Sequence, residues 1–129
     1  MRLLLVEDDE YLRRFLGKVL AAQHDVECVG NGRAALRQLA SNAPDVLLSD
    51  LELPDLCGEE LAQSAAACSQ PPPAIVLWSG DHARLERARP LAAATLPKPF
   101  SIVELAELLE RLAREGTRQT APPPKQDEK

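Results

Sequence analysis

Short apolar runs alternate along this chain with longer segments in which apolar residues recur at helical spacing. The three clearest runs contain no polar interruption, which is typical of strands covered on both faces. They lie at Leu3–Val6, Val46–Leu48 and Ala74–Trp78. A weaker strand is predicted at Asp25–Val29, and a very short one at Thr95–Leu96. The pattern therefore predicts five strands.

Helical patterns follow the strands. Apolar stripes with spacings of one, three and four residues run through residues 11–20 and 34–40, and residues 59–68 are rich in alanine, the best helix former. The last helix is the clearest, because Ser101 and Glu104 form a capping box directly before a leucine stripe. The segment after the fourth strand contains a proline, which predicts a short or broken helix there.

The order of these elements is βαβαβαβαβα, which predicts an α/β fold with a parallel five-stranded sheet and helices on both faces. Right-handed crossovers leave few topologies, and the flavodoxin-like (βα)5 arrangement of strand order 2-1-3-4-5 is common at a length of 129 residues. We expect one domain at residues 1–115. Residues 116–129 have only one alanine and three prolines as apolar content, which predicts a flexible tail or the start of a linker.

Composition excludes several classes of protein. The 20 acidic residues outnumber the 15 basic ones, and the net charge of −5 argues against direct binding of nucleic acid or of an anionic membrane. No apolar stretch approaches membrane-spanning length, so we expect no membrane insertion. The three cysteines form no CxxC pair and no cluster with histidine, which argues against a zinc site and indicates a reducing, cytoplasmic location.

Potentially reactive side chains follow four of the five predicted strands. Glu7 and Asp8 come after the first, Asp50 after the third, Ser79 after the fourth and Lys98 after the fifth. In an open parallel sheet the ligand site lies at the carboxyl ends of the strands, so these groups are expected to converge. Three carboxylates repel one another unless a cation lies between them, and oxygen ligands alone favour Mg²⁺. A lysine and a hydroxyl beside them suit a phosphoryl group.

Four motifs carry a resemblance to a known family. They are LLLVEDD at the end of the first strand, LLSDLELPDLCG around Asp50, LWSG around Ser79 and LPKPF around Lys98. In this order and at these strand ends they resemble the receiver domain of the bacterial response-regulator family. The resemblance covers residues 1–115, the whole predicted domain.

The resemblance implies a role for each of the reactive residues. Asp50 is the implied phosphoacceptor, a nucleophile that forms an acyl phosphate. Lys98 is expected to contact the phosphoryl group, and the hydroxyl of Ser79 to move towards that group once it arrives.

The resemblance also implies a Mg²⁺ site. Asp8 is the expected direct ligand together with Asp50, Glu7 is expected to act through water, and the backbone carbonyl of Glu52 completes the protein ligands. The side chain of Glu52 is given no role. Asp9 is expected to act only as a cap of the helix that follows it.

The function implied is that of a switch. A sensor histidine kinase or a histidine phosphotransfer protein would donate its phosphoryl group to Asp50, and the phosphorylated chain, a monomer or a phosphorylation-dependent dimer, would bind or release a downstream protein target. Such a domain is a signalling module, not a metabolic enzyme, because it catalyses only its own phosphorylation and dephosphorylation. Two alternatives remain open: a phosphorylation-independent docking module, and a Mg²⁺-dependent phosphohydrolase that uses Glu52 as its acid–base.

Two further expectations concern the segment between Ser79 and Lys98. The Lys98–Pro99 bond is expected to be cis, because the chain must turn there between the lysine and the last helix. Thr95 stands where the family commonly has an aromatic residue, and Pro90 interrupts the fourth helix. We therefore expect activation to order residues 79–90 more than to turn an aromatic side chain.

Overall fold

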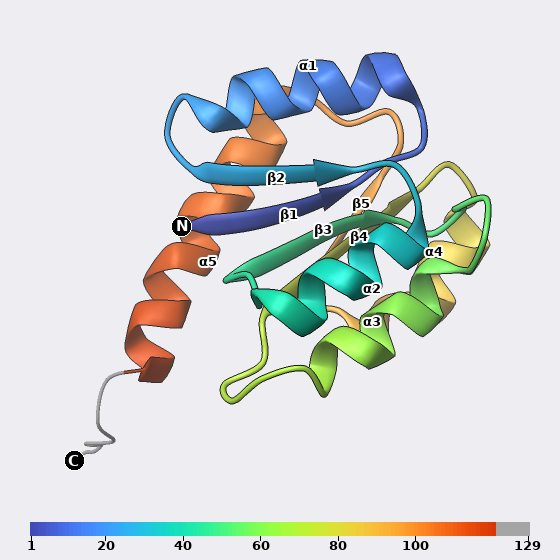
Figure 1. Ribbon diagram of the computed structural model, residues 1–129. Helices are drawn as coiled ribbons and strands as arrows, with labels where there is room; N and C mark the ends of the chain where they lie inside the picture. The colour runs from blue at the N-terminus through green and yellow to red at the C-terminus, as the bar shows by residue number, and fades with distance from the viewer. Residues whose placement is uncertain (121–129) are drawn as a thin grey trace. The chain divides into compact units, whose positions relative to one another are not determined.

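The five predicted strands all form, and they pair in parallel. The computed structural model describes residues 1–120. Its sheet has the strand order β2-β1-β3-β4-β5, which confirms the predicted topology (Figure 1). The strands are β1 (Arg2–Val6), β2 (Asp25–Val29), β3 (Val46–Asp50), β4 (Ala74–Ser79) and β5 (Ala94–Pro97).

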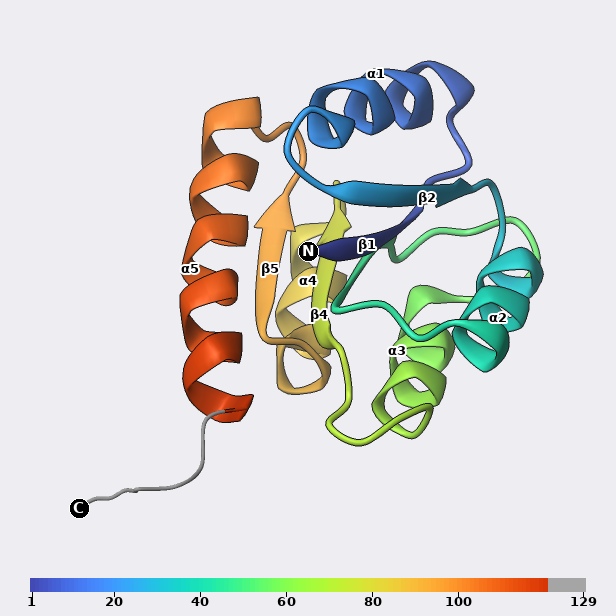
Figure 2. The ribbon, with the colours of Figure 1, turned by 60° about the vertical axis from the view of Figure 1, so that its left-hand side comes forward.

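Helices connect the strands, and a 3₁₀ turn at Arg89–Leu91 follows the fourth of them. In Figures 1 and 2, α1 lies on one side of β1 and β2, and α2 and α3 lie on the other side, as predicted for helices on both faces. The helices are α1 (Glu10–Ala21), α2 (Gly32–Ser41), α3 (Gly58–Ala66), α4 (His82–Ala88) and α5 (Ile102–Thr120).

Polar caps fix where three of the helices begin. Asp9, Asn31 and Asp81 each accept a hydrogen bond from the backbone N–H three residues ahead, at the starts of α1, α2 and α4. Such caps satisfy backbone donors that have no partner inside the helix. The predicted capping role of Asp9 is therefore confirmed, and each of these helices starts close to the end of the preceding strand.

The hydrophobic core explains which strands had a clear sequence pattern. All five residues of β3 are buried, and so are Leu3–Val6 of β1, whereas β2 is an edge strand with no buried residue. One face of the sheet packs against α2, α3 and α4 through buried aliphatic side chains. These include Leu4, Val6, Leu47 and Leu77 from the strands and Leu39, Leu61 and Leu85 from the helices.

The fourth helix is short, as predicted. It has 7 residues, and Pro90 lies in the 3₁₀ turn that follows it. Leu85 and Ala88 anchor it in the core, being 5% and 2% exposed. Ordering of residues 79–90 on activation stays a prediction. The Lys98–Pro99 bond is cis, as expected, and so is Gln70–Pro71, which the sequence did not indicate.

The last helix, α5, carries the predicted capping box. The backbone N–H of Ser101 donates to Oε1 of Glu104 at 2.8 Å, and the backbone N–H of Glu104 donates to Oγ of Ser101 at 3.0 Å. The helix continues to Thr120, past the domain boundary predicted at residue 115, and the rest of the predicted tail, residues 121–129, lies outside the described residues. Within the described part of the chain, no helix combines the length and the apolar character needed to cross a membrane.

Candidate functional site

The carboxyl edge of the sheet brings together the side chains that the sequence singled out. Asp50 and Ser79 are the last residues of β3 and β4, and Asp50 pairs in register with Trp78. Glu7 follows β1 directly, and Lys98 follows β5. The carboxyl ends of neighbouring parallel strands lie at the same edge of the sheet. Residues that are far apart in sequence but each at a strand end therefore lie together in one site.

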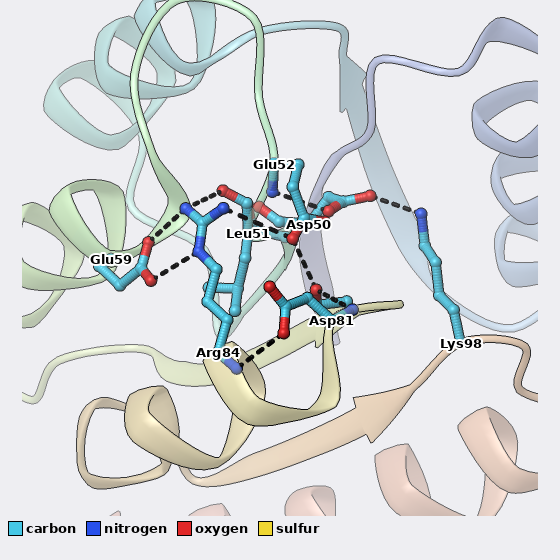
Figure 3. Close-up of polar contacts among 9 residues, drawn as sticks. Asp50, Leu51, Glu52, Glu59, Asp81, Arg84 and Lys98 are labelled. Carbon is cyan, nitrogen blue, oxygen red and sulfur yellow. Dashed lines mark hydrogen bonds and ion pairs between the residues drawn. The ribbon is translucent and has the colours of Figure 1, made fainter.

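Asp50 is a buried carboxylate, 3% exposed, with a defined partner for each oxygen. Its Oδ2 accepts a hydrogen bond from Nζ of Lys98 at 2.5 Å, and its Oδ1 accepts one from the backbone N–H of Glu52 at 2.9 Å (Figure 3). Burial alone would lower the pKa of Lys98, but its bond to Asp50 and the nearby charge of Glu7 outweigh burial and raise that pKa. Lys98 is therefore a permanent cation beside Asp50.

Three carboxylates gather beside this lysine. One oxygen from each of Glu7, Asp8 and Asp50 lies within 4.8 Å of the others, with Glu7 and Asp50 buried and Asp8 exposed. A single lysine does not balance three negative charges, and an all-oxygen donor set suits a hard divalent cation. The residues therefore fit Mg²⁺. The carbonyl of Glu52 as a further ligand stays a prediction.

Trp78 holds Glu7 in place, a contact that the sequence analysis missed. Its indole Nε1 donates to Oε1 of Glu7 at 3.1 Å, while Oε2 of Glu7 accepts from the backbone N–H of Asp9 at 3.1 Å. Burial raises the pKa of Glu7, and the charge of Asp50 raises it further. Trp78 pairs with Asp50 across β3 and β4, and the predicted strand order was the only sequence signal that placed these two strands side by side.

The side chain of Glu52 has a partner that the family resemblance did not imply. Its Oε2 accepts a hydrogen bond of 2.6 Å from the hydroxyl of Ser79, which is fully buried. The Ser79 oxygen in turn accepts from the backbone N–H of Asp81 at 2.9 Å. Glu52 thus contacts the site through its carboxylate as well as through its backbone.

Arg84 connects the first turn of α4 to the segment after β3 (Figure 3). Its Nε and Nη2 each donate to Glu59 of α3 at 2.9 Å, and Nη2 also donates to the carbonyl of Leu51 at 3.0 Å. Its Nη1 lies 3.5 Å from Oε2 of Glu52. These partners lie 25 to 33 residues away, so no local sequence signal marked Arg84.

The loop after β3 is also fixed at its other end. Asp55 accepts hydrogen bonds from the backbone N–H groups of Gly32 and Arg33, at 2.8 and 2.9 Å, at the start of α2. The bond from Arg33 is the main cause that lowers the pKa of Asp55. The backbone N–H of Gly58 donates to the carbonyl of Leu51 at 2.9 Å, which closes the loop on the residue after Asp50.

The pair of Glu59 and Arg84 predicts a loss of stability in acid. The hydrogen bonds from Arg84 lower the pKa of Glu59 from 4.5 to about 2. An acid whose pKa is lower in the folded state stabilises the fold above its unfolded pKa, and this contribution is lost as the pH falls through the folded pKa. Because Glu59 is partly exposed, we expect Glu59→Gln to lower the free energy of unfolding by about 1–2 kcal/mol at pH 7.

The difference between wild type and Glu59→Gln should shrink as the pH falls from about 4.5 and should close near pH 2. Urea denaturation across that range measures the difference, with Glu86→Gln as the control because the ion pair that Glu86 forms with Arg89 is exposed. A difference that does not change with pH would contradict the assignment.

The sheet order and the hydrogen bond between Asp50 and Lys98 at its carboxyl edge are the features on which the comparison with known proteins bears. Residues 3–110 match the family model of the response regulator receiver domain. The chain belongs to this family.

Relatives and solved structures agree with this assignment. The chain is 34% identical over 121 residues to the response regulator MprA of Mycolicibacterium vanbaalenii, with 91% of this chain and 52% of the relative covered. It is similar to a CheY-like receiver domain from Methylobacillus flagellatus, with a TM-score of 0.79, 27% identity, and 87% of this chain and 98% of that one covered. It is also similar to the response regulator TrrA from Thermotoga maritima in complex with Mg²⁺ and BeF, with a TM-score of 0.76, 26% identity, and 86% and 97% covered. The chain spans about a third to a half of the length of the curated relatives it matches.

Proposed function

We propose that the chain accepts a phosphoryl group on Asp50 from the phosphohistidine of a histidine kinase or phosphotransfer protein, and that this phosphorylation switches its binding of a downstream protein. The observation that supports this most directly is the hydrogen bond between Asp50 and Lys98, beside the acidic pair Glu7 and Asp8. The proposed nucleophile Asp50, the cation of Lys98 and a set of carboxylates that fits a metal ion are then close to one another.

The transfer is a displacement at phosphorus. A carboxylate oxygen of Asp50 forms a bond to phosphorus while the phosphorus–nitrogen bond of the phosphohistidine breaks, and the imidazole leaves with that electron pair. Lys98 offsets the charge of the phosphoryl oxygens, and the hydroxyl of Ser79 donates a hydrogen bond to one of them. Attack by water on the same phosphorus later regenerates the carboxylate and releases phosphate.

A magnesium ion completes this site in our proposal. Glu7, Asp8 and Asp50 would hold it, with the backbone carbonyl of Glu52. When bound, the ion supplies positive charge next to the phosphoryl oxygens, so that the carboxylates no longer repel the incoming anion. The solved structure of TrrA, in complex with Mg²⁺ and BeF, supports this part of the proposal.

We propose a cytoplasmic location, supported by the three cysteines, Cys28, Cys57 and Cys68, which are all free. A sensor kinase or phosphotransfer protein is the proposed donor, and a protein is the proposed target. Binding of that target as a monomer or as a phosphorylation-dependent dimer is part of the same proposal.

Intact mass after incubation with acetyl phosphate and Mg²⁺ tests the proposal. Wild type is expected to gain one phosphoryl adduct, which Asp50→Asn and removal of Mg²⁺ by EDTA should both abolish. Asp25→Asn is the matched control, because Asp25 is the first residue of β2 and so lies at the opposite end of the strand from the carboxyl edge that carries the site. No adduct on wild type would favour a docking module. Steady turnover of a phosphate monoester would favour a phosphohydrolase.

A further inference from the structure

The hydroxyl of Ser79 already has an acceptor before any phosphoryl group arrives. A serine hydroxyl has one proton and therefore one donor bond at a time, and here that bond goes to the carboxylate of Glu52 at 2.6 Å. The switch role proposed above requires the same proton for a phosphoryl oxygen. Glu52 and the phosphoryl group are thus competitors for one hydrogen bond.

We propose that Glu52 is a latch that holds Ser79 in the unphosphorylated state, and that Arg84 positions Glu52 and receives it when the latch opens. The proposal rests on the proposed function, since it concerns regulation of the same site. It assigns roles to two side chains, Glu52 and Arg84, that the family resemblance left without one.

The strength of the latch follows from its surroundings. Ser79 is fully buried, and its acceptor is a carboxylate; hydrogen bonds to a charged group are about twice as strong as neutral ones. Glu52 is also hydrogen-bonded to Asp50: the backbone N–H of Glu52 donates to Oδ1 of Asp50 at 2.9 Å. One residue therefore bonds to both the phosphoacceptor and the switch hydroxyl, so that a change at Asp50 reaches Ser79 directly.

Arg84 provides the alternative partner for Glu52. Its Nη1 lies 3.5 Å from the oxygen that accepts from Ser79, so the carboxylate keeps an ion pair after it loses that bond. Two bonds to Glu59 and one to the carbonyl of Leu51 fix the guanidinium independently of Glu52. A phosphoryl group on Asp50 adds negative charge beside Glu52, which favours its release towards Arg84.

Affinity for beryllofluoride with MgCl₂, an acyl-phosphate mimic, measures how readily the latch opens. Fluorescence of Trp78, which is the chain's only tryptophan and contacts Glu7, reports binding, and isothermal titration calorimetry measures it independently. A neutral amide accepts a weaker hydrogen bond from the Ser79 hydroxyl than a carboxylate does, so the hydroxyl is released more readily. Glu52→Gln is therefore expected to bind the mimic about fivefold more tightly than wild type. The matched control Glu86→Gln, an exposed glutamate on α4, should match wild type.

Removal of a negative charge could also attract the anion through space, and a double-mutant cycle separates the two effects. If Glu52 acts by holding Ser79, the gain from Glu52→Gln should fall below about twofold in a Ser79→Ala background. An equal gain in both backgrounds would show a simple charge effect and overturn the latch.

Arg84 should shift the affinity in the opposite direction. Without its alternative partner the carboxylate retains Ser79 more firmly, so Arg84→Gln is expected to weaken binding of the mimic about threefold, and Arg84→Lys to restore part of it. Tighter binding by Arg84→Gln would overturn its assigned role.

The two proposals fail in different ways. If wild type forms the adduct on Asp50 but Glu52→Gln binds the mimic as wild type does, the latch is overturned and the proposed function stands. If wild type forms no adduct and binds no beryllofluoride by calorimetry, both are overturned. Thermal denaturation of each variant confirms that the fold is intact.

Discussion

Replacing Gly58 with alanine is expected to lower the free energy of unfolding by about 3 kcal/mol, at the upper end of the usual cost of overpacking. A Cβ at this position would lie 2.6 Å from the carbonyl oxygen of Asp50 and 2.8 Å from Cα of Leu51. Both are backbone atoms, which cannot rotate away as a side chain can. Either the start of α3 or the end of β3 must move.

The same substitution should also slow the phosphorylation of Asp50 that we propose. Oδ2 of Asp50 accepts a hydrogen bond from Lys98, and a shift of the Asp50 backbone would displace this proposed nucleophile from that cation. Because small displacements of reacting groups have large effects on rate, we expect adduct formation from acetyl phosphate to slow about tenfold.

Gly80→Ala is the matched control for stability, because an added Cβ there meets nothing within 4 Å. Its free energy of unfolding should stay within about 0.5 kcal/mol of wild type. Urea denaturation measures both variants, and time-resolved intact mass measures the rate for Gly58→Ala. Equal stability of the two alanine variants would contradict the packing argument.

The fold was readable from sequence because burial imposes an apolar pattern. The strands β1, β3 and β4 are the three central strands of the sheet, and their runs of apolar residues were unbroken. The edge strands β2 and β5 are covered less completely, and their patterns were correspondingly weak. Beyond Leu112, which is buried, α5 continues to Thr120 without an apolar stripe, so the sequence pattern gave no signal for where this helix ends.

The sequence predicted only those residues of the candidate site that lie next to a predicted strand end. Asp50, Ser79 and Lys98 adjoin strands, so the topology alone brings them together. The contacts of Arg84 with Glu52 depend on side chains 32 residues apart and on the placement of a short helix. No periodicity or motif encodes such a contact, and it became visible only with the packed structure.

The contact between Trp78 and Glu7 is expected to make a second large contribution to stability. Both side chains are almost completely buried, at 0% and 1% exposed, and the indole N–H donates to a carboxylate oxygen. Phenylalanine fills most of the same space but has no donor. Loss of a hydrogen bond to a buried charged group costs about 1.5–3 kcal/mol, so with the smaller ring we expect Trp78→Phe to lower the free energy of unfolding by about 3 kcal/mol.

A cycle with Glu7→Gln separates the hydrogen bond from the loss of ring volume. In the Glu7→Gln background the acceptor is neutral, so Trp78→Phe should cost only about 1–1.5 kcal/mol, which leaves a coupling of about 1.5–2 kcal/mol. Urea denaturation followed by circular dichroism measures all four proteins without relying on tryptophan fluorescence, with Mg²⁺ excluded by EDTA. A coupling near zero would mean that Trp78 stabilises the sheet edge by packing alone. The expected coupling would show that Trp78 holds Glu7, a residue of the predicted Mg²⁺ site, in position from a neighbouring strand end.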